Sequence, residues 1–121
     1  MPANKVLVVD DSATDLSNLR GILQDAGWIV STATSGEKAI ERAKNDRPNI
    51  IFLDIVMPQL DGFGTSRALG DDPSTKGIPV VFVSTKSTKA DQIWAKAQGG
   101  KALISKPFSA DQILDALKYA A

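Results

Sequence analysis

The 121-residue sequence contains no histidine and no cysteine. Without histidine the commonest general base is missing, and a Ser-His-Asp hydrolytic site cannot be built. Without cysteine, disulfides, thiolate catalysis and zinc–sulfur sites are excluded. The chemistry of any functional site must therefore come from oxygen-bearing side chains and from basic side chains other than histidine.

The sequence also has no excess of charge of either sign, because 14 basic residues balance 14 acidic residues. A net charge of zero offers no basic surface for nucleic acid, so we expect no nucleic-acid partner. The N-terminal residues lack the apolar core of a signal peptide, and no apolar run approaches the length that spans a membrane. We therefore expect a cytoplasmic protein that does not insert into membranes.

Five short apolar or β-rich runs alternate with segments that carry apolar residues at helical spacing. The predicted strands cover residues 5–9, 28–33, 50–53, 78–83 and 102–105. The predicted helices cover about residues 13–26, 34–46, 63–69, 89–98 and 110–117. Unbroken apolar strands are typical of a parallel sheet, and strict alternation with helices predicts a doubly wound α/β fold. No linker interrupts the chain, so we expect one domain over residues 1–121.

Several helix ends carry cap signals. Ser12, with Asp15 three residues later, resembles a capping box, and Ser109 with Gln112 is a clear one. Thr88 is expected to cap the fourth helix. The apolar face of that helix is predicted to consist of Ala90, Ile93, Trp94 and Ala97. We interpret Trp94 and Trp28 as packing residues, although a partly exposed Trp94 would be available to a partner.

Polar residues follow four of the five predicted strands, namely Asp10 and Asp11, then Asp54, Ser84 and Lys106. Because parallel strands end at one edge of the sheet, we expect these side chains to converge there. Three carboxylates together would repel one another and raise a pKa unless a cation lay among them. An all-oxygen ligand set fits Mg²⁺ best, with Mn²⁺ and Ca²⁺ as alternatives.

The same edge would suit phosphoryl transfer. A metal ion, the Lys106 ammonium and the Ser84 hydroxyl could together neutralise the oxygens of a phosphoryl group. Asp54 would then be the nucleophile and would form an aspartyl phosphate.

These motifs, taken in order along the whole chain, resemble the receiver domain of two-component response regulators. Each is weak alone, but their order and spacing together are specific. The resemblance covers residues 1–121 and leaves no segment for an output domain. The matching segments are Val8–Ser12, Leu53–Pro58 with Asp61 and Gly62, Val83–Thr85, and Ser105–Phe108.

The resemblance implies a flavodoxin-like sheet of strand order 2-1-3-4-5 and a cis bond before Pro107. It implies that a partner histidine kinase phosphorylates Asp54 from a phosphohistidine, with Ser84 and Lys106 assisting. Mg²⁺ would be held by Asp11, Asp54 and the Val56 backbone carbonyl, with Asp10 acting through water. The protein would then be a monomeric signalling protein and no enzyme beyond its own phosphoryl transfer and dephosphorylation. A downstream protein would bind the fourth helix, fifth strand and fifth helix, about residues 87–121.

Within this family, the chain looks most like stand-alone chemotaxis receivers, especially those of type IV pilus (twitching motility) systems. That narrower likeness depends mainly on the sequence around Trp94. One position departs from the family pattern, because Leu103 stands where many receivers have an aromatic residue that rotates inward. We therefore expect coupling through loop and helix shifts instead of an aromatic rotamer switch.

Other interpretations compete with the site. Asp10 and Asp11 could be a solvated turn, Asp54 an Asx turn, and Lys106 an exposed strand-end lysine. The location of all of them at matching strand ends favours a common site. We assign Asp71, Asp72 and the lysines at positions 86, 89 and 96 to solvated faces.

Other functions are also open. A Mg²⁺-dependent phosphatase or phosphotransferase for small molecules would need a second carboxylate two residues after its nucleophile, where Val56 stands. A nucleotide-binding module would need a glycine-rich loop after the first strand, and that loop is absent from the sequence. Within the switch function, a phosphate sink for a shared kinase remains an alternative to a signal carrier.

Overall fold

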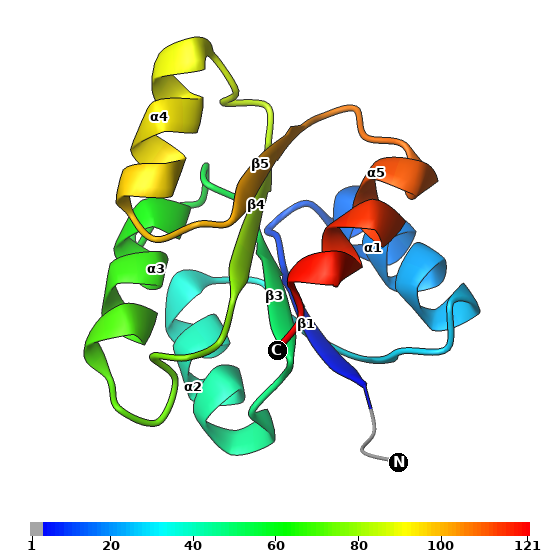
Figure 1. Ribbon diagram of the computed structural model, residues 1–121, viewed down its shortest axis with the longest axis horizontal. Helices are drawn as coiled ribbons and strands as arrows, with labels where there is room; N and C mark the ends of the chain where they lie inside the picture. Colours follow the sequence, from blue (N-terminus) through cyan, green and yellow to red (C-terminus); the bar gives the residue numbers. More distant parts are fainter. Residues whose placement is uncertain (1–3) are drawn as a thin grey trace.

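The computed structural model describes residues 4–121 as a parallel sheet with helices on both faces (Figure 1). The sheet order is β2-β1-β3-β4-β5, so the predicted order and the flavodoxin-like fold are confirmed. The strands are β1 (Lys5–Val9), β2 (Ile29–Ala33), β3 (Ile50–Leu53), β4 (Val80–Ser84) and β5 (Ala102–Ser105). The helices are α1 (Ala13–Asp25), α2 (Gly36–Asp46), α3 (Gly62–Asp71), α4 (Lys89–Ala97) and α5 (Ala110–Ala116), followed by the 3-10 helix η1 (Leu117–Tyr119).

Alternate residues of the central strands point into two hydrophobic cores. Val6 and Val8 of β1 face a core shared with α1 and α5, whereas Leu7 and Val9 face one shared with α2, α3 and α4. Figure 1 shows the same division, with α1 and α5 on one face and the other three helices opposite. Burial on both faces explains why β3 and the last four residues of β1 are apolar without interruption.

Some element ends differ from the prediction. β4 begins at Val80 and not at residue 78, because Pro79 has no N–H for the ladder; its carbonyl still accepts a hydrogen bond from the Ile51 N–H at 2.9 Å. α2 begins at Gly36 and not at residue 34, because Ser35 caps it by accepting the Lys38 N–H. α3 continues to Asp71, two residues beyond the predicted end.

The outer face of α4 corrects the predicted packing of that helix. Ile93 and Trp94 are 64% and 54% exposed, and Ala90 and Ala97 are exposed with them. The face that packs on the sheet instead carries Ala95 and the capping residue Asp91. Helical spacing defines an apolar stripe but does not say which side faces the sheet. The interpretation of Trp94 as a packing residue was therefore wrong, whereas Trp28 does pack against the α1/α5 core.

Asn49 links three segments at the amino-terminal edge of the sheet. Its side-chain carbonyl accepts the Lys5 N–H at 2.8 Å, and its amide donates to the Ala121 carbonyl at 2.9 Å. The Ala121 N–H donates back to the Asn49 carbonyl at 3.0 Å. Across residues 4–121, no helix is long and apolar enough to cross a membrane.

Candidate functional site

The backbone of the sheet positions three predicted site residues. Asp10, Asp54 and Lys106 each come directly after a strand. The N–H of each still donates to a carbonyl of the neighbouring strand, at 3.1, 3.0 and 3.0 Å respectively. These bonds extend the ladder by one residue and fix the three side chains at one edge. The peptide bond between Lys106 and Pro107 is cis, as expected.

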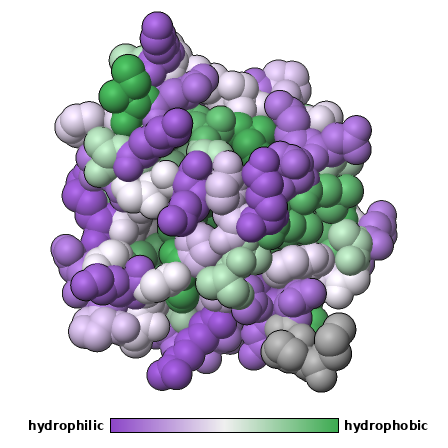
Figure 2. Space-filling view, viewed as in Figure 1, coloured by the Kyte–Doolittle hydropathy of each residue, from purple (hydrophilic) through white to green (hydrophobic). Residues whose placement is uncertain are grey.

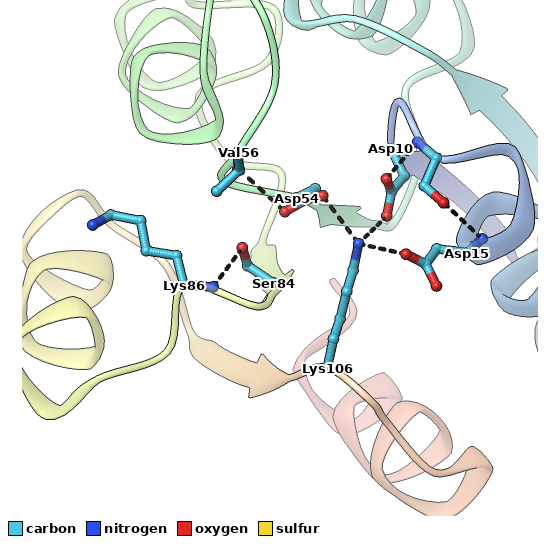
Figure 3. Close-up of polar contacts among 8 residues, drawn as sticks. Asp10, Asp15, Asp54, Val56, Ser84, Lys86 and Lys106 are labelled. Carbon is cyan, nitrogen blue, oxygen red and sulfur yellow. Dashed lines mark hydrogen bonds and ion pairs between the residues drawn. The ribbon is translucent and has the colours of Figure 1, made fainter.

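The Lys106 ammonium lies at the centre of a cluster of carboxylates (Figure 3). Its Nζ is 2.8 Å from Asp10 Oδ2, 3.0 Å from Asp54 Oδ2 and 2.8 Å from Asp15 Oδ2. The Lys106 side chain is only 10% exposed. An ammonium has three N–H donors, so each of the three carboxylates uses one of them.

Asp15 was not predicted as a site residue. Ser12 does accept the Asp15 N–H, at 3.3 Å, which is half of the predicted capping box. The other half is wrong, because the Asp15 carboxylate turns to Lys106 and the Ser12 N–H donates instead to Asp10 Oδ1 at 2.9 Å. The spacing of Asp15 from Ser12 fits a capping box equally well, so the sequence carried no signal that distinguished the two roles of Asp15.

Asp10, Asp11 and Asp54 can hold a metal ion. Each offers a carboxylate oxygen, and these oxygens lie within 4.8 Å of one another. Asp10 and Asp54 are buried, whereas Asp11 is exposed and leaves one side open to water. A hard oxygen-only set with room for several waters is what Mg²⁺ requires, so the residues present fit that ion.

The electrostatics of the cluster favour an added cation. Burial raises the pKa of Asp10 above its ordinary value and the Asp54 charge adds to the effect, although hydrogen bonds from Lys106 and the Ser12 N–H oppose it. Burial acts to lower the pKa of Lys106, but hydrogen bonds to its carboxylate partners outweigh burial and raise it. Lys106 is therefore charged at neutral pH, and one ammonium faces Asp10, Asp15 and Asp54, with Asp11 nearby.

Ser84 and Val56 lie beside the cluster without joining its ion pairs. Ser84 is buried at the end of β4, and its hydroxyl accepts the Lys86 N–H at 3.2 Å, without a hydrogen bond to Asp54 or Lys106. The Val56 N–H donates to Asp54 Oδ1 at 3.2 Å, while the residue as a whole is 55% exposed. Both residues thus lie at the carboxyl-terminal edge of the sheet, as predicted. The assignment of the Val56 carbonyl as a metal ligand stays a prediction.

A second ion pair joins the loop after β4 to the first turn of α4. Lys86 Nζ lies 3.0 Å from Asp91 Oδ1, so Lys86 is not simply solvated as its sequence context suggested. Asp91 Oδ2 accepts from the Thr88 N–H and hydroxyl at 2.9 and 2.8 Å, and the Thr88 hydroxyl accepts the Asp91 N–H. Hydrogen bonds from Lys86 and then Thr88 lower the pKa of Asp91. The predicted Thr88 cap is confirmed as a full capping box.

Gly62 allows the loop after Asp54 to fold back over it. The Gly62 N–H donates to the Ile55 carbonyl at 2.8 Å. A Cβ at position 62 would collide with the Asp54 carbonyl oxygen and lie 2.7 Å from Ile55 Cα. These contacts are with backbone atoms that cannot move aside, so only glycine fits this position.

Comparison with known proteins finds relatives that cover most of the chain. The family model described as "Response regulator receiver domain" matches residues 6–118. PilH of Pseudomonas aeruginosa is 36% identical over 110 residues, with 91% of each chain covered. PilG of the same organism is 36% identical over 114 residues, which cover 94% of this chain and 84% of PilG.

Solved structures show the same likeness. The chemotaxis protein CheY4 of Vibrio cholerae superposes with a TM-score of 0.91 at 31% identity, covering 99% of this chain and 100% of CheY4. CheY in a CheX-CheY-BeF3-Mg complex from Borrelia burgdorferi has a TM-score of 0.89 at 28% identity, covering 98% of this chain and 89% of that one.

Proposed function

This chain belongs to the response regulator receiver family, and from that premise we propose that it is a phosphorylation switch in which Asp54 accepts a phosphoryl group from a histidine kinase. The observation that carries the proposal is the surroundings of Asp54. Its buried carboxylate lies at the end of a central strand, bound to the Lys106 ammonium and grouped with two further carboxylates that fit Mg²⁺.

In this mechanism an Asp54 oxygen attacks the phosphorus, the P–N bond of the phosphohistidine breaks, and its electron pair stays on the departing imidazole. Asp11, Asp54 and the Val56 carbonyl would bind Mg²⁺ directly, with Asp10 acting through water. The ion, when bound, supplies positive charge that neutralises the phosphoryl oxygens. Lys106 donates an N–H to one of those oxygens.

Ser84 is suited to donate to a second phosphoryl oxygen. Its hydroxyl accepts the Lys86 N–H at 3.2 Å and keeps its own O–H available. When Ser84 turns toward the phosphoryl group, that turn acts on the Lys86 backbone and so on the start of α4. Because position 103 is leucine, this route replaces an aromatic switch.

The output surface is assigned to α4, β5 and α5, about residues 87–121. Support comes from the exposed apolar stripe on α4, with Ile93 and Trp94 at its centre. Figure 2 shows apolar side chains on the molecular surface over this helix, at the upper left. Because Ile93 and Trp94 are neighbours, they form a contiguous exposed apolar patch of the kind that marks interaction sites, so a downstream protein is the expected ligand.

We further assign the chain to type IV pilus or chemotaxis-like signalling, as a cytoplasmic and monomeric protein. The likeness to PilH and PilG at 36% identity supports that pathway. The role is one of signalling, with no substrate turned over other than the phosphoryl group itself.

The test is the intact mass of the protein after incubation with acetyl phosphate and Mg²⁺. We expect the wild type to gain one phosphoryl group, and Asp54→Asn or omission of the metal to prevent the gain. Asp111→Asn, which removes an exposed carboxylate from α5, is the matched control and should be phosphorylated normally. Phosphorylation of Asp54→Asn, or none of the wild type with either acetyl phosphate or a kinase, would contradict the proposal.

A further inference from the structure

The contact between Asp15 and Lys106 has no part in the mechanism described so far. It is as short as the contact with Asp10, 2.8 Å, and shorter than the contact with Asp54, 3.0 Å. Asp15 comes from α1, and the Ser12 cap holds its backbone. The Lys106 ammonium is thus held by a carboxylate outside both the metal-binding set and the phosphoryl acceptor.

The Asp15 contact matters because the Lys106 ammonium has no N–H donor left for a phosphoryl group. Lys106 has three N–H groups, and all three are used in the unphosphorylated protein. Figure 3 shows Asp54 and Ser84 on one side of Nζ and Asp15 on the other. A phosphoryl group on Asp54 would therefore draw the ammonium away from Asp15.

Burial indicates which contact is released. The Asp10 and Asp54 side chains are 1% and 7% exposed, so either would lose its partner without gaining water. The Asp15 side chain is 30% exposed and can replace the ammonium with solvent. Asp15 is the partner whose loss costs least.

We propose that Asp15 is a positioning residue that holds Lys106 in the unphosphorylated arrangement and opposes its movement to the phosphoryl group. This inference depends on the proposed function of Asp54. Asp15 acts through Lys106 and touches neither the phosphoryl group nor the metal. Its removal should favour the phosphorylated arrangement.

The test uses beryllofluoride with Mg²⁺ as a non-covalent stand-in for the phosphoryl group, with binding measured by calorimetry. We expect Asp15→Asn to bind it roughly fivefold more tightly, the ratio for a partly exposed ion pair worth about 1 kcal/mol. Asp15→Glu keeps the charge that pairs with Lys106 and should bind like the wild type. Asp25→Asn removes an exposed carboxylate from the far end of α1 and should change nothing.

A double-mutant cycle separates the pair from a general charge effect, because any lost negative charge near the site favours an anion. In a Lys106→Met background, Asp15→Asn should tighten binding much less than in the wild type. Equal tightening in both backgrounds would overturn the proposal. So would Asp15→Glu binding as tightly as Asp15→Asn, a comparison that does not require Lys106→Met to fold.

Measurements on the wild type distinguish a failure of the Asp15 role from a failure of the proposed function of Asp54. If it binds beryllofluoride with Mg²⁺ and Asp15→Asn binds no more tightly, the role of Asp15 is wrong and the proposed function stands. If the wild type neither binds beryllofluoride nor becomes phosphorylated on Asp54, the proposed function fails, and the role of Asp15 fails with it.

Discussion

Two lysines follow neighbouring strands of this sheet, and their surroundings differ in kind. The Lys106 cluster (Lys106, Asp10, Asp15 and Asp54) joins three carboxylates from separate segments to an ammonium that is 10% exposed. The Lys86 cluster (Lys86, Thr88 and Asp91) pairs one carboxylate with a lysine that is 48% exposed, and all three residues lie in the β4–α4 loop or the first turn of α4.

The difference lies in burial and in charge balance. In the Lys86 cluster one positive charge meets one negative charge, and the carboxylate divides its oxygens between Lys86 and the capping box. In the Lys106 cluster carboxylates outnumber the ammonium, and Asp11 adds another at the edge. An ion pair with equal positive and negative charge is sufficient to stabilise the start of a helix. A buried cluster with more carboxylates than ammonium groups favours the binding of a further cation.

The largest difference should appear when each lysine is replaced. Lys106→Met leaves Asp10 and Asp54 buried without a cation, and should lower the free energy of unfolding by about 3–5 kcal/mol in metal-free buffer at neutral pH. Lys86→Met removes a half-exposed partner and should cost less than about 1 kcal/mol. Urea unfolding measures both, and equal losses would contradict the comparison.

Added Mg²⁺ should stabilise the protein through the Lys106 cluster alone. The expected gain is about 2.7 kcal/mol at a metal concentration one hundred times the dissociation constant. Asp11→Asn should remove most of the gain, whereas Lys86→Met should retain it. A titration of the unfolding midpoint with Mg²⁺ shows whether this is so, and a gain that survives in Asp11→Asn would rule out the assigned ligands.

A smaller effect is expected for the Thr88 cap. Thr88→Ala removes the hydroxyl that accepts the Asp91 N–H, and should cost about 1 kcal/mol, typical of a lost N-cap. Hydrogen exchange should increase first in the amino-terminal turn of α4, without a change in Mg²⁺ affinity. Ser109→Ala, which removes the equivalent cap of α5, serves as the control and should leave α4 unchanged.

The pH dependence of stability should have opposite signs for the two clusters in metal-free buffer. The pKa of Asp10 is raised in the folded protein, so its contribution to stability falls as pH rises from 3.8 through the folded pKa. The pKa of Asp91 is lowered, so its contribution is full above 3.8 and is lost as pH falls through the folded pKa. Asp10→Asn should therefore remove a decline in the free energy of unfolding with pH, and Asp91→Asn a rise. Slopes that change in the same direction would contradict this assignment.

Residues at strand ends could be predicted from the sequence, whereas the contacts made by some helix residues could not. Asp10, Asp54 and Lys106 were predictable because each follows a strand, and parallel strands bring their ends to one edge. Asp15 was not, because its spacing from Ser12 also fits a capping box, and the choice between the two depends on where Lys106 lies. Similarly, the stripe containing Ile93 and Trp94 is visible in the sequence, but helical spacing does not show that the face with Asp91 and Ala95 is the buried one.

The hydrogen bonds of Asn49 indicate where a label or a fused protein can be attached without covering the site. They hold Ala121 at the amino-terminal edge of the sheet, whereas Asp54 lies at the opposite end of β3. Five residues at strand spacing separate Asn49 from Asp54 by about 16 Å. A dye, a sensor surface or a fused protein joined next to Ala121 would leave the edge that carries Asp54 uncovered. Such a label would lie at the opposite edge of the sheet from Asp54 and would not touch the site.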